Sequence, residues 1–400
     1  MTPLTPPSAF RPPTDEFWAC VRLAGAELPA HRLRALLEAA PSPLAALDLS
    51  GDVLAAPPLA LTAKQIARFD KARRAPLPPR IVAAAERLAV SAVLWSDPVY
   101  PANLLPFPDA PALLFVRGTL LPDDRFSVAL VGSRRATHYG HKQAERFARA
   151  FAERGLVVVS GGAAGIDTSA HKGALWAGGR TIAVVGCGLD VTYPSENRGL
   201  FDEIVERGGA LLSEFTLGTT PEPWRFPTRN RIIAGMTRAT ILVETPQASG
   251  ALITAGDAAQ YGRDVWVVPG PIDTGRSRGG HQLIQDGAAL ADSPDDVLAA
   301  LGLEPLEQPA PTAPAATAEK VPVVEDRRFA EAAPPPAAVA ADLSPDQAQL
   351  LQRLDLTPRH LDDAAEAAGL PAAQATVAAT LLEMKGLVRR LPGNLYVRAL

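Results

Sequence analysis

Small residues and arginines occur together where a predicted strand ends, in the run VALVGSRRATHYG. The strand stops at Gly132, and Ser133, Arg134 and Arg135 open the next element. Glycine lets a backbone approach closely, and the N-terminus of a following helix favours anions. A guanidinium can bind a phosphate through two hydrogen bonds. The run therefore predicts a phosphate-contacting turn.

A second loop of small residues follows the next predicted strand, in VVVSGGAAGIDTSAHKGAL. Its backbone N–H groups are not screened by side chains, which suits a phosphate or sugar-phosphate chain. Asp167 falls near the N-cap of the following helix, and His171 lies on the same helical face. The alternative is that Asp167 only caps its helix and that His171 is an ordinary buried histidine. The small residues of this loop are Ser160, Gly161, Gly162 and Gly165.

A third run, WRFPTRNRIIAG, alternates guanidiniums with aromatic rings, which is the minimal equipment for single-stranded nucleic acid. The alternative is that Arg229 and Arg231 pair with Glu214 or Glu222 and that Phe226 belongs to the core. A fourth strand end carries three small or hydroxyl residues before and within a helix, namely Ser249, Gly250 and Thr254. All four runs lie at strand ends of one predicted sheet, where open α/β sheets bind ligands.

Several common enzyme classes fit these residues poorly. The GSRR turn lacks the third glycine of a dinucleotide fingerprint, and the acidic residue expected about 20 positions later falls at Glu153, inside a helix. There is no phosphate loop of the GxxxxGK[ST] type, no GxSxG elbow and no HExxH pair. The two cysteines, Cys20 and Cys187, lack metal-ligand spacing. We predict neither a metal nor a cofactor.

Short, continuously apolar runs alternate with helical stretches between about residues 95 and 300. FSVALVG, LVVVSGG, TIAVVGCG, ATILVE and DVWVVPG are such runs. Strands of this kind lie in a parallel sheet that is covered by helices on both faces. This segment therefore predicts a Rossmann-like, doubly wound α/β domain with a mostly parallel sheet.

Other segments flank this predicted domain. Residues 1–14 form a Pro-rich tail, 15–85 a small helical module and 304–341 a Pro/Ala-rich linker. Residues 343–400 predict three helices followed by a hairpin, the order of a winged helix. In that module Lys385 is the one basic residue of the predicted third helix, which suits a major-groove reader poorly. Arg389, Arg390 and Arg398 in the hairpin are better candidates, so duplex DNA and protein are both open as its partner.

The 400 residues include 43 acidic and 39 basic ones, for a net charge of −4, and 47% are hydrophobic. This composition predicts a globular chain and excludes a histone-like basic protein, but a local basic groove remains compatible with nucleic acid. No uncharged apolar stretch of about 18 residues occurs, and the N-terminus lacks a signal-peptide core. We therefore expect no membrane contact and a cytoplasmic location.

The segment from about 95 to 300 resembles the DNA-processing A (DprA/Smf) proteins of bacterial transformation. LVGSRRAT, VVVSGGAAGIDTSAHKGAL, TIAVVGCGLDVTYPSENRGL, WRFPTRNRIIAG, SGALITA, GRDVWVVPGPI and HQLIQDGA match the family in order and spacing. The N-terminal helices resemble the sterile-alpha-motif-like (SAM-like) module of many members, and the C-terminus resembles their winged helix. The resemblance implies a non-catalytic recombination mediator. Such a protein binds and protects incoming single-stranded DNA, relieves blockage by single-strand-binding protein, helps to load the RecA recombinase and forms a homodimer.

Carried over residue by residue, the resemblance implies that the Gly132–Arg134 turn is the main phosphate-contacting loop. The loop from Ser160 to Asp167 would line the same groove. Many members carry a basic residue where this chain has Ala164, and Arg135 or Lys172 could replace it. The family's stacking and basic contacts fall on Phe226, Arg229, Asn230 and Arg231, and Ser249, Gly250 and Thr254 would close the pocket. Tyr193, Pro194 and Asn197 match a further family signature whose role could be structural.

Two other functions compete with this reading. The strand-end SGG loop also resembles the nucleotide phosphoribohydrolases of the lysine-decarboxylase-like (LOG) family, although Asp167 falls at the wrong spacing for their catalytic glutamate. Glu244, Asp257 and His171 are then the conceivable acid–base groups. A transcription factor would rest on the winged helix alone. Beyond DNA, the winged helix could also bind single-strand-binding protein or a competence protein.

Overall fold

The computed structural model describes residues 13–303, 343–355, 359–391 and 395–398. The chain forms two compact units, Met1–Thr312 and Ala313–Leu400. The predicted linker over 304–341 and residues 1–12 of the predicted tail lie outside the described residues. Within the described ranges, no helix combines the length and the apolar character that crossing a bilayer requires.

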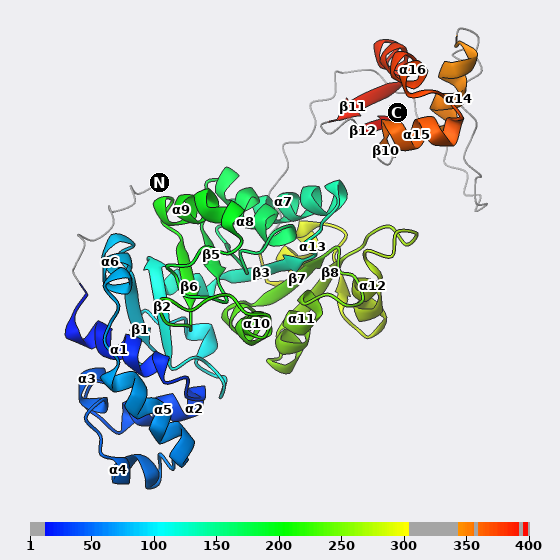
Figure 1. Cartoon of the computed structure of the whole chain (residues 1–400). Coiled ribbons are helices and arrows are strands. Elements are labelled where there is room, and N and C mark those ends of the chain that lie inside the picture. The colour runs from blue at the N-terminus through cyan, green and yellow to red at the C-terminus, as the bar shows by residue number, and fades with distance from the viewer. Residues whose placement is uncertain (1–12, 304–342, 356–358, 392–394, 399–400) are drawn as a thin grey trace. The chain divides into compact units, whose positions relative to one another are not determined.

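A nine-stranded sheet forms the centre of the first unit, in the order β1-β2-β6-β5-β4-β3-β7-β8-β9 (Figure 1). β2 pairs antiparallel with both β1 and β6, and every other neighbouring pair is parallel. The predicted mostly parallel, doubly wound sheet is confirmed. Its strands are β1 (Ser91–Leu94), β2 (Leu113–Gly118), β3 (Ser127–Gly132), β4 (Val157–Ser160), β5 (Thr181–Val184), β6 (Ala210–Ser213), β7 (Ala239–Val243), β8 (Asp264–Val268) and β9 (Ala289–Leu290).

Helices cover both faces of this sheet. Side chains alternate between faces along a strand, so Val128 and Leu130 of β3 pack with α7 and α8, whereas Ala129 and Val131 pack in the cluster that contains α10 and α11. Figure 1 shows α7, α8 and α9 on one side of the sheet and α10 and α11 on the other. The helices are α7 (His138–Glu153), α8 (Ile166–Trp176), α9 (Arg198–Glu206), α10 (Arg225–Met236), α11 (Ala251–Gln260), α12 (Arg278–Gln285) and α13 (Pro294–Ala300).

The strand order reverses at β3, which is the first strand of the parallel part. The chain continues from β3 to its neighbour β4 on one side, and only later returns to β7 on the other side. The helices that follow β3 and β7 therefore lie on opposite faces, and a crevice opens between the two strand ends. The fold thus places the GSRR turn beside the segment that follows β7.

The N-terminal helices share a hydrophobic core with the sheet instead of forming a core of their own. Phe17 of α1 packs edge-on against Phe115 of β2, with ring centroids 6.3 Å apart. Residues of α1 to α6 belong to the same cluster as Ala183 and Leu211. The predicted helical segment is present, and its likeness to a SAM-like module stays a prediction. Its helices are α1 (Asp15–Gly25), α2 (Ala30–Glu38), α3 (Pro43–Ala46), α4 (Gly51–Ala55), α5 (Ala63–Arg74) and α6 (Pro79–Arg87).

The second unit has the predicted three helices and two C-terminal strands, together with one short strand that the sequence did not reveal. The extra strand, β10, pairs with β12 and gives a three-stranded sheet in the order β10-β12-β11. The predicted turn at 392–394 lies outside the described residues. The elements are α14 (Pro345–Arg353), β10 (Arg359–His360), α15 (Leu361–Ala368), α16 (Ala372–Met384), β11 (Val388–Leu391) and β12 (Leu395–Arg398).

Candidate nucleic-acid interface

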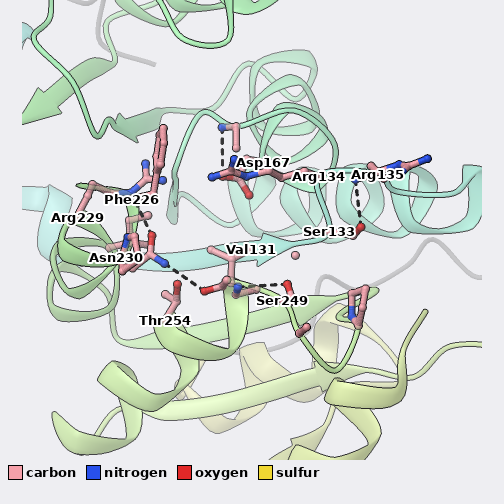
Figure 2. A pocket seen from close by; sticks show the side chains of 18 of the residues that line it. Val131, Ser133, Arg134, Arg135, Asp167, Phe226, Arg229, Asn230, Ser249 and Thr254 are labelled. Carbon is pink, nitrogen blue, oxygen red and sulfur yellow. Dashed lines mark hydrogen bonds between the residues drawn. The ribbon is translucent and has the colours of Figure 1, made fainter. Parts of the chain in front are cut away.

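A pocket of about 810 Å³ opens at the carboxyl ends of β3 and β7, where the strand order reverses. Its lining comes from the turn after β3, the loop before α8, the segment after β7, the first turns of α10 and α11, and a residue of the loop after β8 (Figure 2). The sequence predicted that these strand ends would converge, and the fold brings most of them to one cavity.

The turn after β3 is fixed by close backbone contacts. A Cβ on Gly132 would lie 1.9 Å from the carbonyl oxygen of Val243, so only glycine fits there. Gly165, at φ +82°, lies against the turn, and a Cβ on it would meet the carbonyl oxygen of Ser133 at 2.2 Å. The buried Ser133 hydroxyl accepts a hydrogen bond from the backbone N–H of Arg135 at 3.1 Å. These contacts hold the turn so that Arg134 projects from it.

Arg134 is an exposed cation at the pocket's rim, and it lies over an aromatic ring. Its guanidinium carbon is 4.8 Å from the ring centroid of the half-buried Phe226. The Phe226 ring in turn packs against Tyr193 at 5.4 Å. Among the described residues, no carboxylate forms an ion pair with Arg134. The guanidinium therefore covers one face of the ring, and both groups line the pocket, which suits a phosphate next to an unpaired base.

Arg229, by contrast, lies in the floor of the pocket and is 4% exposed. Its Nη1 donates to the carbonyl oxygen of Gly161 at 2.6 Å and to that of Val184. Its Nε donates to Oδ1 of Asn230 at 3.2 Å. Burial lowers the pKa of Arg229 to about 10, so the guanidinium still carries its charge at neutral pH. Arg229 therefore joins the loop after β4 to the end of β5 instead of presenting a free cation.

Asp167 faces this buried guanidinium and shapes the small-residue loop. Its Oδ2 accepts hydrogen bonds from the backbone N–H groups of Gly161 at 3.1 Å and Ala163 at 3.3 Å. Burial raises the pKa of Asp167, and the charge of Arg229 opposes that shift. Two of the N–H groups that we expected to bind phosphate are thus directed at a carboxylate of the protein itself.

The opposite wall of the pocket is built from α10 and the start of α11. Asn230 links them, because its Nδ2 donates to the carbonyl oxygen of Gly250 at 3.2 Å. The hydroxyl of Ser249 accepts from the backbone N–H of Ala251 at 3.2 Å, and the buried Thr254 lines the cavity one turn later. Figure 2 shows these side chains around the end of β3. Ser249, Gly250 and Thr254 all line this pocket, and their closing role stays a prediction.

Three polar residues of the predicted site lie in the core or in ion pairs, outside the pocket's lining. Ser160 is buried and donates to the carbonyl oxygen of Leu130 at 2.6 Å. His171 is buried completely, and Nδ1 lies 2.7 Å from the hydroxyl of Thr181. Arg231 forms an ion pair with Glu214 at 2.5 Å, one of the two pairings that the sequence left open.

The predicted site also includes Lys172, Gly162 and Arg135. Lys172 is exposed on α8 but does not line the pocket, so it does not replace the missing basic residue at Ala164 there. Gly162 is at φ +66° and its carbonyl oxygen accepts from Nδ2 of Asn197 at 2.9 Å. Asn197, which belongs to the further family signature, therefore holds the small-residue loop through this hydrogen bond. Arg135 does line the pocket, beside Arg134.

Sequence reasoning missed Arg276, an exposed cation in the loop after β8. Its Nη1 donates to the carbonyl oxygen of Arg135 at 2.9 Å and lies 3.8 Å from Oε1 of Glu244. Glu244 is buried at the end of β7 and accepts from the backbone N–H of Thr137 at 3.0 Å. Arg276 thereby ties its loop to the GSRR turn. No local pattern marks this residue, because its partners are far away in the sequence.

The three acid–base groups considered for a hydrolase, Glu244, Asp257 and His171, do not line this pocket. Glu244 caps the start of α7 through Thr137, and neither it nor Asp257 of α11 lines the pocket. His171 is remote from the cavity surface, and Asp167 is engaged by backbone N–H groups. In the part of the chain that the structure describes, no group of three His, Cys, Asp or Glu side chains could hold a metal ion.

Comparison with known proteins agrees with this architecture. Residues 91–302 match the family model of "DNA recombination-mediator protein A", and residues 333–394 match that of the "DprA winged helix domain". "Protein Smf" of Synechocystis is 36% identical over 328 residues, which cover 76% of this chain and 78% of that protein. "DNA processing protein DprA" of Streptococcus pneumoniae is 48% identical over 203 residues, 51% of this chain and 71% of that one.

A solved structure is also similar. The X-ray structure of DNA processing protein A from Streptococcus pneumoniae superimposes with a TM-score of 0.59 at 38% identity, over 70% of this chain and 96% of that one.

Proposed function

This chain belongs to the DNA recombination-mediator protein A (DprA/Smf) family, and from that premise we propose that its pocket binds single-stranded DNA in a non-catalytic step of recombination. The matched family segment, residues 91–302, contains the whole pocket. Membership identifies the protein as a DNA-processing recombination mediator and disfavours the phosphoribohydrolase alternative. The ligand and the residues that hold it follow from the pocket's geometry.

The observation that carries the proposal is the pair formed by Arg134 and Phe226. An exposed guanidinium without a carboxylate partner in the described residues lies 4.8 Å from an aromatic ring, in a cavity of about 810 Å³. A phosphate binds the cation, and an unpaired base stacks on the ring. In duplex DNA the faces of the bases are already stacked on one another, so this arrangement favours single strands.

The binding step needs no chemical reaction at the pocket. Backbone and side-chain donors position the sugar-phosphate chain, and stacking contributes about 1–3 kcal/mol per base. Because phosphate contacts release counterions, binding is largely independent of sequence and weakens with salt. A bound strand would be shielded along the length that lies in the groove, which is the physical basis for protecting incoming DNA during natural transformation.

The family also suggests partners. We propose that two copies of the chain associate through their Rossmann-like domains and that this homodimer helps to load RecA onto the bound strand in the cytoplasm. Two aligned grooves would raise avidity for long strands, because the second contact becomes intramolecular. The family model of the C-terminal unit supports a winged helix there, and we propose that it adds a contact to duplex DNA, to single-strand-binding protein or to a competence protein.

The direct test is fluorescence anisotropy of the full chain with an oligothymidylate of about 20 nucleotides, which exceeds common site sizes. A duplex of equal length is measured beside it. Wild type should prefer the single strand. Arg134→Ala should weaken binding at least tenfold and lower the slope of log Kd against log salt by about 0.7, the value for one phosphate contact to a single strand.

The matched control is Arg149→Ala, which removes the same charge from an exposed position in the C-terminal half of α7, away from the pocket. Equal affinities of wild type and a folded Arg134→Ala variant would contradict the proposed interface.

A further inference from the structure

An exposed indole lies next to the pocket and has no role in the site described so far. Trp224 is the N-cap residue of α10 and is 51% exposed. Its sequence neighbours Pro223 and Phe226 both line the pocket, but Trp224 does not. A single exposed aromatic side chain is common on protein surfaces, so the neighbours of Trp224 decide whether it is prepared for a ligand. A DNA strand that occupies the pocket could therefore extend to the indole.

The indole is held in place by three neighbours. Its Nε1 donates to Oε2 of Glu222 at 2.5 Å. The guanidinium carbon of Arg225 lies 4.8 Å from the Trp224 ring and 5.3 Å from the Phe215 ring. The two rings are nearly perpendicular, at 88°, with centroids 6.2 Å apart. Arg225 therefore fills the corner between the two rings.

Because Arg225 covers one face of the indole, the exposed half of Trp224 includes the opposite face. A ring that is fixed on one side and open on the other is a ready platform for a flat, apolar ligand, since little side-chain freedom remains to be lost on binding. Arg225 itself is buried, and its charge is balanced by Glu222 at 3.6 Å and Glu27 at 3.9 Å. The assembly offers a stacking surface without a free cation.

The order of strands puts this platform in line with the rest of the pocket. Arg276 follows β8, Arg134 follows β3, and Tyr193, which packs on Phe226, follows β5. Phe215 follows β6, the strand beyond β5 in the sheet. A chain that runs along the carboxyl edge of the sheet would meet Arg276, Arg134, Phe226 and then Trp224 in that order.

We propose that Trp224 is a second base-stacking subsite for single-stranded DNA, outside the pocket, at the start of the helix that carries Phe226. This inference rests on the proposed function, because it extends the same strand beyond the pocket toward β6. The subsite takes any base, since every base has a flat face. It acts without binding a phosphate, because the charges around it are already paired.

Because the Trp224 subsite binds no phosphate, its substitution can be distinguished from that of Arg134. Removal of Trp224 lowers affinity but leaves the salt dependence unchanged, whereas removal of Arg134 lowers both. For one partly exposed ring, we expect Trp224→Ala to weaken binding of a long oligothymidylate about fivefold to tenfold. Trp224→Phe keeps a ring and should restore most of the affinity.

The chain offers a matched control in Trp176, which is 58% exposed and is the last residue of α8. The pocket lies at the start of α8, and a helix of 11 residues is about 16 Å long. Trp176→Ala should therefore bind like wild type. The experiment measures anisotropy across a salt series for wild type, Trp224→Ala, Trp224→Phe, Trp176→Ala and Arg134→Ala, with thermal melts to verify folding.

Tryptophan fluorescence gives an independent readout. A base stacked on Trp224 should quench part of the emission, and that part should vanish in Trp224→Phe but persist in a Trp176→Phe variant. If Trp224→Ala binds like wild type, or if Trp224→Phe keeps the full quench while Arg134→Ala loses binding, the subsite is wrong and the proposed function stands. If wild type fails to bind single strands, both proposals are wrong.

Discussion

Two sets of arginines lie at the same edge of the sheet, and they differ in what surrounds them. The rim set, Arg134, Arg135 and Arg276, is exposed, and its members flank the pocket. The second set, called the floor set here, is Arg225, Arg229 and Arg231, which are half-buried or buried; Arg229 lines the pocket, whereas Arg225 and Arg231 lie outside its lining. Their guanidiniums contact carbonyl oxygens or carboxylates of the protein. The rim is equipped to bind a ligand, and the floor is equipped to hold the loops that shape the pocket.

The difference follows from the cost of removing charge from water. A buried guanidinium needs compensating partners inside the protein, and Arg229 has them in the carbonyl oxygens of Gly161 and Val184, as Arg231 has in the carboxylate of Glu214. An exposed arginine keeps its hydration until a phosphate replaces it. Arginines in similar motifs at strand ends therefore have different roles: an exposed one is available to a ligand, whereas a buried one holds the loops around it.

The largest expected effect is on stability and comes from the floor. Arg229→Ala leaves the carbonyl oxygens of Gly161 and Val184 without their donor and removes the charge that opposes the desolvation of Asp167. Each buried polar group left without a partner costs about 1–3 kcal/mol. Urea unfolding of Arg229→Ala and Arg134→Ala beside wild type measures it. We expect Arg229→Ala to lose unfolding free energy by this amount. Arg134→Ala should lose less than about 0.5 kcal/mol, an ordinary value for a substitution at a surface site.

The comparison would break if Arg229→Ala kept wild-type stability and lost DNA binding selectively. In that case the floor guanidinium would contact the ligand directly, and the division into rim and floor would be wrong.

The next effect is on binding and concerns the ring under the rim cation. Phe226→Ala removes a stacking surface and the support of Arg134, and should cost about 1–3 kcal/mol of affinity for oligothymidylate. A double-mutant cycle with Arg134→Ala isolates the coupling between cation and ring, which should be about 0.5–1 kcal/mol, the value for an exposed cation–π pair. Anisotropy titrations of the four proteins give this number. Strict additivity would mean that the two groups bind the strand independently.

The sequence was sufficient for the strand ends and for Gly132, because apolar runs and glycines are local signals. It was also sufficient for Arg134, whose motif lies directly at a strand end. It could not separate Arg134 from Arg229, since both are arginines in motifs of the same kind and only the packing of α10 against the loop after β4 and the end of β5 buries one of them.

Two other residues illustrate the same limit. His171 was grouped with Asp167 because they share a helical face, but that face packs on the sheet, where Thr181 of β5 receives the imidazole. Arg276 was absent from the predicted site because its contacts, Arg135 and Glu244, depend on the β3–β7–β8 neighbourhood. The positions of His171 and Arg276 depend on contacts between residues far apart in the sequence, and local sequence periodicity does not predict such contacts.

A third prediction concerns pH and the buried histidine. The hydroxyl of Thr181 donates to the carbonyl oxygen of Val158 at 2.6 Å, so its oxygen must accept from Nδ1–H of His171. Nε2 then carries no proton and has no partner. Burial, with the charge of Arg229, lowers the pKa of His171 to about 3. Below its ordinary pKa of about 6.5, the unfolded chain binds a proton that the folded chain rejects.

Stability should therefore fall as the pH drops from about 6.5 toward 3, by up to about 1.4 kcal/mol per pH unit for this group. His171→Asn, which does not titrate, should show a shallower pH dependence of the unfolding free energy even though its stability is lower at neutral pH. The comparison uses the slopes of unfolding free energy against pH in the two proteins, so the contributions of other titrating groups, such as Asp167, cancel. Parallel slopes for the two proteins would mean that His171 is protonated equally in the folded and unfolded chains.

The smallest effect is expected from Arg276, the third rim arginine. Its substitution tests whether a rim arginine positions the turn or binds a phosphate. Arg276 is partly neutralised by Glu244 and donates to the backbone of the GSRR turn, so its removal should loosen the turn without removing a phosphate contact. Arg276→Ala should weaken oligothymidylate binding about two- to threefold, in keeping with the small worth of a partly exposed ion pair. Its salt slope should equal that of wild type, and Arg276→Lys should restore part of the affinity. A slope lowered by about 0.7, as for Arg134→Ala, would instead make Arg276 a direct phosphate ligand and widen the groove to β8.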